Sequence, residues 1–186
     1  DEYQELFKKV FRSSIIRPEY MLKALAQFTG QLTSANSKYD RYKKGEATFT
    51  AQEENGYQLY RANCASCHPE PMFTDYSFRN IGLPVDGFLN DYGLMRITGN
   101  KADSLKFRVP TLRNTYISSN YMHDGRFGTI QQCINHYRTG VQQSTTLDPS
   151  LTSGIALTTT ETNNLFVFLR ALTDSAFITN PRYAKP

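Results

Sequence analysis

Residues Cys64-Ala65-Ser66-Cys67-His68 form a C-x-x-C-H motif, and they set the class of the protein. Two cysteines at this spacing can each form a thioether bond to one haem, and the histidine that follows can bind its iron. The alternatives are two ordinary buried cysteines or half of a zinc site. A zinc site needs a second Cys/His pair at metal-binding spacing, which the remaining Cys133, His123 and His136 do not form. The motif therefore predicts covalently bound haem c.

Length and composition narrow the class further. A chain of 186 residues is one large domain, or one domain with an additional helical lobe. The net charge of +4 is too small to indicate a nucleic-acid partner. No apolar stretch approaches the roughly 20 residues that a membrane span requires. With two of three cysteines in the motif, a disulfide framework is excluded.

Helix signals occur on both sides of the motif. Pro18 indicates a helix start, and one apolar face follows it until residues 36–40 break the pattern. Three capping boxes predict further helices. They begin at Thr50, with a helix to about Asn63; at Thr129, with a short helix to about Gly140; and at Thr158, with an apolar stripe of Leu165, Phe168, Leu169 and Leu172.

Residues 69–119 are rich in Gly, Pro, Asn and Asp and show little periodicity. A long irregular segment in a compact domain usually has a function, and here we expect it to wrap the haem. One helix leading into C-x-x-C-H and a C-terminal helix packing against it is the plan of cytochrome c. The predicted fold is all-α: a cytochrome c-like domain with long irregular haem-wrapping loops and additional N-terminal helices.

The second axial ligand of the iron would set its redox chemistry. Helical periodicity does not choose among the downstream candidates, although His136 and Tyr137 are about 100° apart on a helix, so only one can face the iron. The candidates are Met72, Met95, Met122, His123, His136 and Tyr137.

Several ordered motifs resemble those of the bacterial di-haem cytochrome c peroxidases, a family that includes the MauG-type maturation enzymes. The resemblance extends from about Pro18 to Thr173. Its motifs are NSKYDRY (36–42), CASCH (64–68), FTD (73–75), NIGLP (80–84), FRVPTLRN (107–114) and YMHDG (121–125).

The resemblance implies that this chain is the C-terminal haem domain of such a protein. Residues 1–45 would be a helical segment leading in from a missing N-terminal haem domain, 46–178 the cytochrome c-like domain, and 179–186 a tail. The family's N-terminal haem reduces hydrogen peroxide, and its C-terminal haem receives electrons from a small donor protein such as a cytochrome c. Because this sequence has a single C-x-x-C-H motif, the isolated chain is expected to be inactive. The attachment of c-type haem in bacteria indicates a periplasmic location, and a homodimer is possible.

The resemblance also assigns the distal iron ligand to Tyr137. Peroxidases proper have methionine at this position, and the maturation enzyme has tyrosine. A phenolate ligand stabilises oxidised iron and lowers its potential. His136 is the second choice and Met122 the third.

Further site residues follow from the same resemblance. Arg108 is expected to bind a haem propionate, and Arg113 either does the same or forms a salt bridge or a contact with a helix carbonyl. His123 is expected near the haem, hydrogen bonded to Asp124 or a propionate. Backbone carbonyls of Ser118 and Asn120 would contribute to a calcium site between the two haem domains.

Three functions are compatible with these features. The leading hypothesis is the electron-transfer domain of a periplasmic di-haem peroxidase. A stand-alone mono-haem electron-transfer cytochrome and a MauG-like oxidative modifier of another protein are the alternatives. A second C-x-x-C-H motif in the parent reading frame would favour the enzymes.

Overall fold

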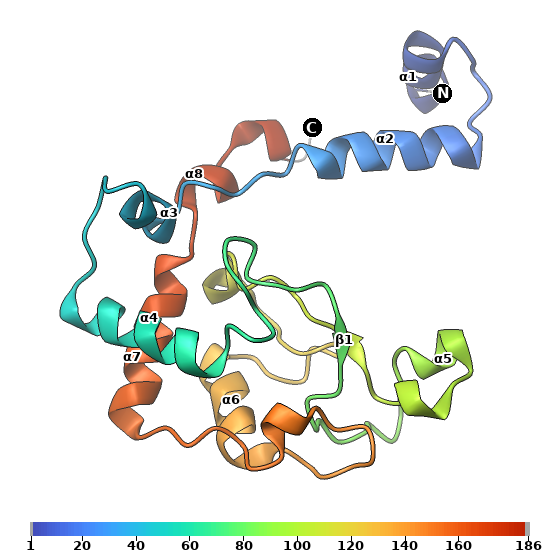
Figure 1. Cartoon of the computed structure of the whole chain (residues 1–186). Coiled ribbons are helices and arrows are strands. Elements are labelled where there is room, and N and C mark those ends of the chain that lie inside the picture. Colours follow the sequence, from blue (N-terminus) through green and yellow to red (C-terminus); the bar gives the residue numbers. More distant parts are fainter. Residues whose placement is uncertain (1, 185–186) are drawn as a thin grey trace. The chain divides into compact units, whose positions relative to one another are not determined.

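The computed structural model describes residues 2–184, which divide into two compact units (Figure 1). One unit ends at Ala35 and resumes at Ser175, and the other is Asn36–Asp174. The fold is predominantly helical, as predicted. Within the described residues, no helix combines the length and apolar character needed to cross a membrane.

The first unit consists of short helices. They are α1 (Glu2–Phe11), α2 (Pro18–Gly30), α8 (Ser175–Ile178) and a 3-10 turn at Pro181–Tyr183. Helix α2 begins at Pro18, as predicted, with the proline in its first turn. The apolar face of α2 is exposed within the described structure, and Phe28 retains 47% of its accessible surface. The Tyr183 hydroxyl donates a hydrogen bond to the Gln31 carbonyl (2.9 Å) and so ties the C-terminal turn to the end of α2.

The second unit contains the C-x-x-C-H motif. Its helices are α3 (Lys38–Lys43), α4 (Ala51–Asn63), α5 (Met95–Thr98), α6 (Ile130–Asn135) and α7 (Thr159–Ala171). All three predicted capping boxes are present, with reciprocal hydrogen bonds at Thr50, Thr129 and Thr158. A fourth capping box at Ser37 begins α3, inside a segment that the sequence led us to describe as a break.

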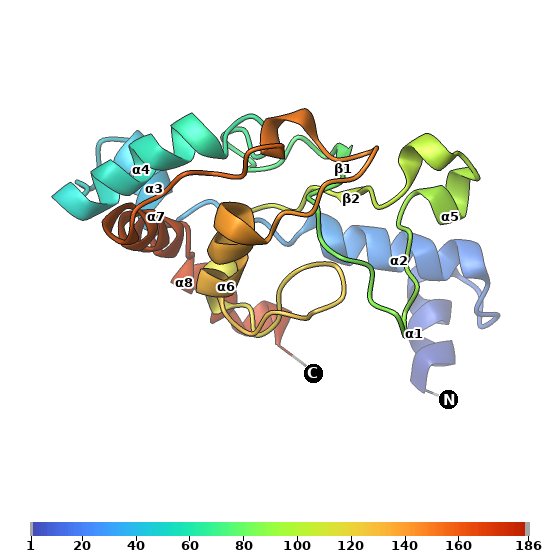
Figure 2. The same cartoon turned by 90° about the horizontal axis from the view of Figure 1, so that it is seen from below.

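The predicted pairing of the helix before the motif with the C-terminal helix is confirmed. Helices α4 and α7 make the most extensive contact in the chain's described part and lie against each other in both views (Figure 1; Figure 2). Gly56 lies where they cross, because a Cβ built there would be 2.0 Å from the Asn164 carbonyl oxygen. A larger residue at this point would separate the two helices.

The core next to this crossing is aromatic. Tyr39, Tyr57, Tyr60, Phe73 and Phe168 are all buried and have ring centroids 4.8–6.4 Å apart where they pair. We call these five residues the aromatic cluster. Edge-to-face and tilted geometries of this kind stabilise a core beyond the area that the rings bury.

One strand pair was not predicted. Strands β1 (Phe78–Arg79) and β2 (Phe107–Arg108) pair antiparallel, with Phe78 opposite Arg108. This small sheet joins two parts of the irregular segment that follows the motif. The all-α class therefore holds with one two-stranded sheet added to it.

Candidate haem site

The motif continues directly from the end of α4. The Cys64 amide donates to the Tyr60 carbonyl (2.8 Å), and the His68 amide donates to the Cys64 carbonyl (2.9 Å). The Tyr60 hydroxyl donates to the carbonyl of His68. Because these bonds fold the motif into a tight turn on a capped helix, the two thiols and the imidazole project from a rigid base.

The hydrogen bonds of His68 determine its tautomer. Its Nδ1 lies 3.0 Å from the carbonyl oxygens of both Phe73 and Pro110. Carbonyl oxygens only accept, so Nδ1 carries the proton and Nε2 keeps its lone pair. Burial lowers the pKa of His68, outweighing its backbone hydrogen bonds, and so favours the neutral ring. A neutral imidazole with Nδ1–H bound to a carbonyl is the usual form of a metal-binding histidine.

The two acceptor carbonyls belong to segments that are fastened to each other. The Thr74 hydroxyl donates to the Val109 carbonyl (2.7 Å), and the Thr111 hydroxyl donates to the Met72 carbonyl (2.6 Å). The Leu112 amide donates to the Phe73 carbonyl itself (3.2 Å). Sequence reasoning did not identify Phe73 or Pro110 as part of the site, because their contribution is a backbone oxygen. The only available signal was their presence in the two family motifs.

The cysteines of the motif are free thiols. Burial raises the pKa of Cys64 to about 12, with a smaller contribution from the nearby Cys67. Cys64 is therefore a neutral thiol at physiological pH. The motif residues thus fit a c-type haem in donor chemistry: two thiols for thioether bonds and one imidazole nitrogen for the iron.

Tyr137 was the first choice for the distal iron ligand. It belongs to a π-helical turn, His136–Gly140, that follows α6 and that the sequence did not predict. Burial raises the pKa of Tyr137, and the thiols of Cys64, Cys133 and Cys67 add to the effect. Two of these three cysteines belong to the C-x-x-C-H motif. Turns of π-helix occur frequently at functional sites.

His136 has a different hydrogen-bonding environment. Its Nε2 lies 2.9 Å from the Ile81 carbonyl oxygen and therefore carries the proton. Its Nδ1 lies against Gly140, where a Cβ would come within 3.0 Å of that nitrogen. The ring thus connects the π-helical turn to the loop at Ile81. Met122, the third choice, has a left-handed backbone (φ 69°) in the turn bounded by the Tyr121–Phe127 bridge.

The two arginines that were considered as propionate ligands have different environments. Arg108 is exposed, and its guanidinium lies 4.9 Å from the centre of the Tyr76 ring. Arg113 is in the salt bridge that was its alternative role: both terminal nitrogens contact the Asp40 carboxylate, at 2.9 and 2.8 Å.

His123 is stacked on a phenylalanine. Its ring centre lies 3.6 Å from that of Phe107, with an interplanar angle of 14°. Its Nε2 is 3.9 Å from Asp124, too far for the expected hydrogen bond but within reach of an ion pair. Asp124 instead accepts from Arg126 Nε (2.7 Å).

The residues expected at a calcium ion are at the surface. Ser118 and Asn120 are exposed, and the Asn120 amide donates to the Ser119 hydroxyl (3.3 Å). No group of three His, Cys, Asp or Glu side chains suited to a metal occurs in residues 2–184.

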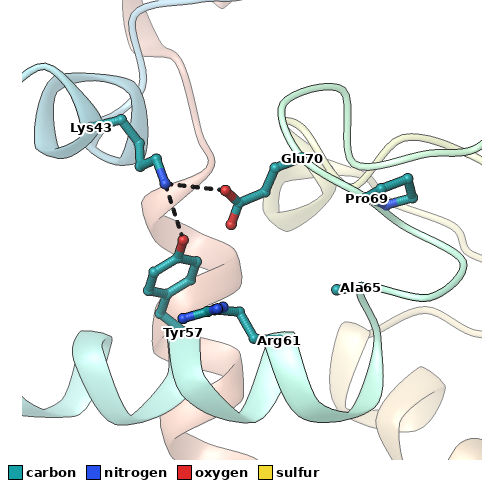
Figure 3. A pocket seen from close by; sticks show the side chains of 6 residues that line it. All are labelled: Lys43, Tyr57, Arg61, Ala65, Pro69 and Glu70. Carbon is teal, nitrogen blue, oxygen red and sulfur yellow. Dashed lines mark hydrogen bonds and ion pairs between the residues drawn. The ribbon is translucent and has the colours of Figure 1, made fainter.

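A pocket of about 470 Å³ lies beside the motif (Figure 3). Lys43 projects into it, with Nζ 3.3 Å from the Tyr57 hydroxyl and 3.2 Å from a Glu70 carboxylate oxygen. Neither thiol nor the His68 imidazole lines this pocket, so it is distinct from the candidate haem site. Its lining residues are Lys43, Tyr57, Arg61, Ala65, Pro69 and Glu70.

Comparison with known proteins agrees with this chemistry. The sequence profile of the di-haem cytochrome c peroxidase family matches residues 1–48. The cytochrome c551 peroxidase of Nitrosomonas europaea is 36% identical over 137 residues, which are 72% of this chain and 41% of that protein. The methylamine utilization protein MauG of Methylorubrum extorquens is 31% identical over 187 residues, which are 97% of this chain and 52% of that protein.

A solved structure extends the comparison to the fold. The crystal structure of a MauG-like protein associated with microbial copper homeostasis matches with a TM-score of 0.85 and 30% identity, covering 100% of this chain and 62% of that one. This chain spans about half the length of the curated relatives it matches. Its motifs, its fold and these relatives show that the chain belongs to the MauG-like family of di-haem cytochrome c peroxidases, whose cofactor is haem.

Proposed function

We propose that this chain is the haem c electron-transfer domain of a periplasmic di-haem cytochrome c peroxidase. The observation that carries the proposal is the state of His68. Two backbone carbonyls hold its Nδ1 proton, which leaves Nε2 available on a ring that burial keeps neutral. This arrangement, directly after two free thiols, suits a covalently attached haem whose iron is bound by histidine.

In this proposal Cys64 and Cys67 would form the thioether bonds, and His68 and Tyr137 would bind the iron. The electrostatic influence of both thiols on the pKa of Tyr137 supports the last assignment. Arg108, which is exposed, is available to bind a propionate. Bound haem supplies reversible one-electron transfer, and ligands on both sides of the iron would exclude peroxide from this site.

The peroxide-reducing haem would then lie in a second domain outside this sequence. The partial coverage of the relatives supports a two-domain protein. Electrons would come from a small donor such as a cytochrome c. Residues 46–178 would form the haem domain, and Ser118 and Asn120 would offer carbonyls to calcium at its boundary.

The test uses the full-length protein, expressed in a periplasm with haem-attachment machinery. Intact mass should show porphyrin bound to the wild type, and one porphyrin fewer on a Cys64→Ser/Cys67→Ser variant. Peroxide turnover with a reduced cytochrome donor should be lost in that variant. A wild-type mass without porphyrin on the peptide that contains Cys64 would overturn the proposal.

A MauG-like oxidative modifier is the second candidate, and the tyrosine near the motif favours it. The two functions differ in what is oxidised. A peroxidase consumes reduced donor in proportion to peroxide, whereas a modifier oxidises another protein with little use of donor. Donor oxidation measured against added peroxide therefore distinguishes them.

A further inference from the structure

We infer that Arg113, paired with Asp40, is a positioning residue for the proximal histidine. The inference rests on the proposed function, because it requires that His68 binds haem iron. It gives Arg113 a role other than contact with a propionate. Its basis is the set of bonds that connect the guanidinium to the two carbonyls holding the His68 ring.

All three nitrogens of the Arg113 guanidinium are engaged. The two terminal nitrogens each donate a hydrogen bond to one oxygen of the Asp40 carboxylate, and Nε donates to the Pro71 carbonyl (3.0 Å). Both side chains of this ion pair are about nine-tenths buried, with 9% and 10% exposed. The planar guanidinium suits this double recognition, which a lysine ammonium cannot reproduce.

The Asp40 carboxylate is itself fixed. It accepts hydrogen bonds from the Ser37 amide (2.8 Å) and hydroxyl (2.7 Å) at the capping box that begins α3. The ion pair therefore anchors Arg113 to the first turn of α3.

Arg113 is linked to both acceptors of the His68 proton. Pro110 is three residues before it in the same segment. Phe73 is two residues after Pro71, whose carbonyl accepts the hydrogen bond from Arg113 Nε. The guanidinium also lies 5.5 Å from the centre of the Phe73 ring. Arg113 thus holds together the two segments that supply the carbonyls at His68 Nδ1.

The consequence would appear at the iron. A hydrogen bond from Nδ1–H to a carbonyl orients the imidazole and makes Nε2 a stronger donor, which stabilises oxidised iron. Loosening the two segments should weaken these bonds and allow the ring to rotate. The midpoint potential of this haem should then rise, and its ferric low-spin spectrum should change.

The experiment compares full-length, haem-loaded variants. Arg113→Lys keeps the charge but cannot bind Asp40 and Pro71 together. Arg126→Lys is the matched control, since it alters an ion pair with Asp124 that has no contact with the His68 carbonyls. We expect a higher midpoint potential and shifted electron paramagnetic resonance g values in Arg113→Lys, and wild-type values in the control.

A role in stability alone would have a different signature. Arg113→Lys would then melt at a lower temperature while its potential and g values stayed at wild-type values, and this result would overturn the inference. If Arg113→Lys does not fold, Thr111→Val replaces it, since it removes the bond to the Met72 carbonyl (2.6 Å) and the bond that the Thr111 hydroxyl accepts from the Arg113 amide (3.2 Å). A smaller upward shift in Thr111→Val supports the inference, and an unchanged potential rejects it. A wild-type protein without a low-spin haem signal rejects the proposed function itself, before any variant is compared.

Discussion

Gly56 lies at the crossing of α4 and α7, so replacing it with alanine tests how closely these helices approach. A Cβ at this position would be 2.0 Å from the Asn164 carbonyl oxygen, 2.7 Å from its carbon and 2.8 Å from Phe168 Cβ. Ordinary contacts of a Cβ begin at about 3.4 Å, so the added atom overlaps by about 1.4 Å with α7 backbone. Backbone cannot rotate away, and the helices must separate.

Two opposing effects determine how much the substitution changes the free energy of unfolding. Overpacking a core costs about 1–3 kcal/mol, and a clash with backbone belongs at the upper end of that range. Alanine in a helix interior returns about 1 kcal/mol relative to glycine. The net loss is therefore about 2 kcal/mol, which lowers the Tm of a domain of this size by roughly 4–8 °C.

Thermal unfolding followed by circular dichroism measures this difference. Gly30→Ala is the matched control, because its Cβ would meet no atom within 4 Å, and its Tm should not fall below that of the wild type. A Tm of Gly56→Ala equal to or above that of the wild type would refute the close approach of α4 and α7. The higher helix propensity of alanine alone would then account for the Tm of this variant.

Three further predictions concern the site and its surroundings. Tyr137→Phe should raise the midpoint potential of the haem and change its ferric spectrum; an unchanged spectrum would exclude Tyr137 as a ligand. His136→Ala should leave the Ile81 carbonyl without its donor and lower the free energy of unfolding by about 1–3 kcal/mol in denaturant titration, while the haem spectrum stays constant. Loss of the low-spin spectrum would instead make His136 the ligand. Burial opposes ionisation of Asp75, but hydrogen bonds led by that of Arg79 hold its pKa at about 2. Because an unfolded aspartate has a pKa of about 3.9, this stabilisation is complete above that value and declines as pH falls toward 2. Asp75→Asn should therefore lose less stability than the wild type between pH 4 and pH 2, and equal acid sensitivity would contradict the assignment.

The helix starts were predictable because their signals are local. Each capping box at Thr50, Thr129 and Thr158 places both partners within four consecutive residues, so the sequence alone specifies the bond. The start of α3 was missed because its box closes with Asp40, where glutamate or glutamine is the usual residue. The same carboxylate also binds Arg113, which is 73 residues further along the chain.

The rest of the site depends on contacts between distant segments. Pro110 reaches His68 across a separation of 42 residues, and β1 pairs with β2 through strands of two residues each. Neither leaves a periodic pattern in the sequence, since a backbone carbonyl has no side-chain signature. The tautomer of His68 therefore could be read only from the folded chain.

The aromatic cluster gives the protein an intrinsic optical reporter. The chain has 12 tyrosines and no tryptophan, so its ultraviolet fluorescence comes from tyrosine alone. Tyr60 is fully buried and donates to the carbonyl of His68, which places one of these emitters within hydrogen-bonding distance of the motif. Porphyrins absorb at the wavelengths that tyrosine emits, so maturation should dim the emission, and the brightness of a preparation should report its fraction of haem-free molecules.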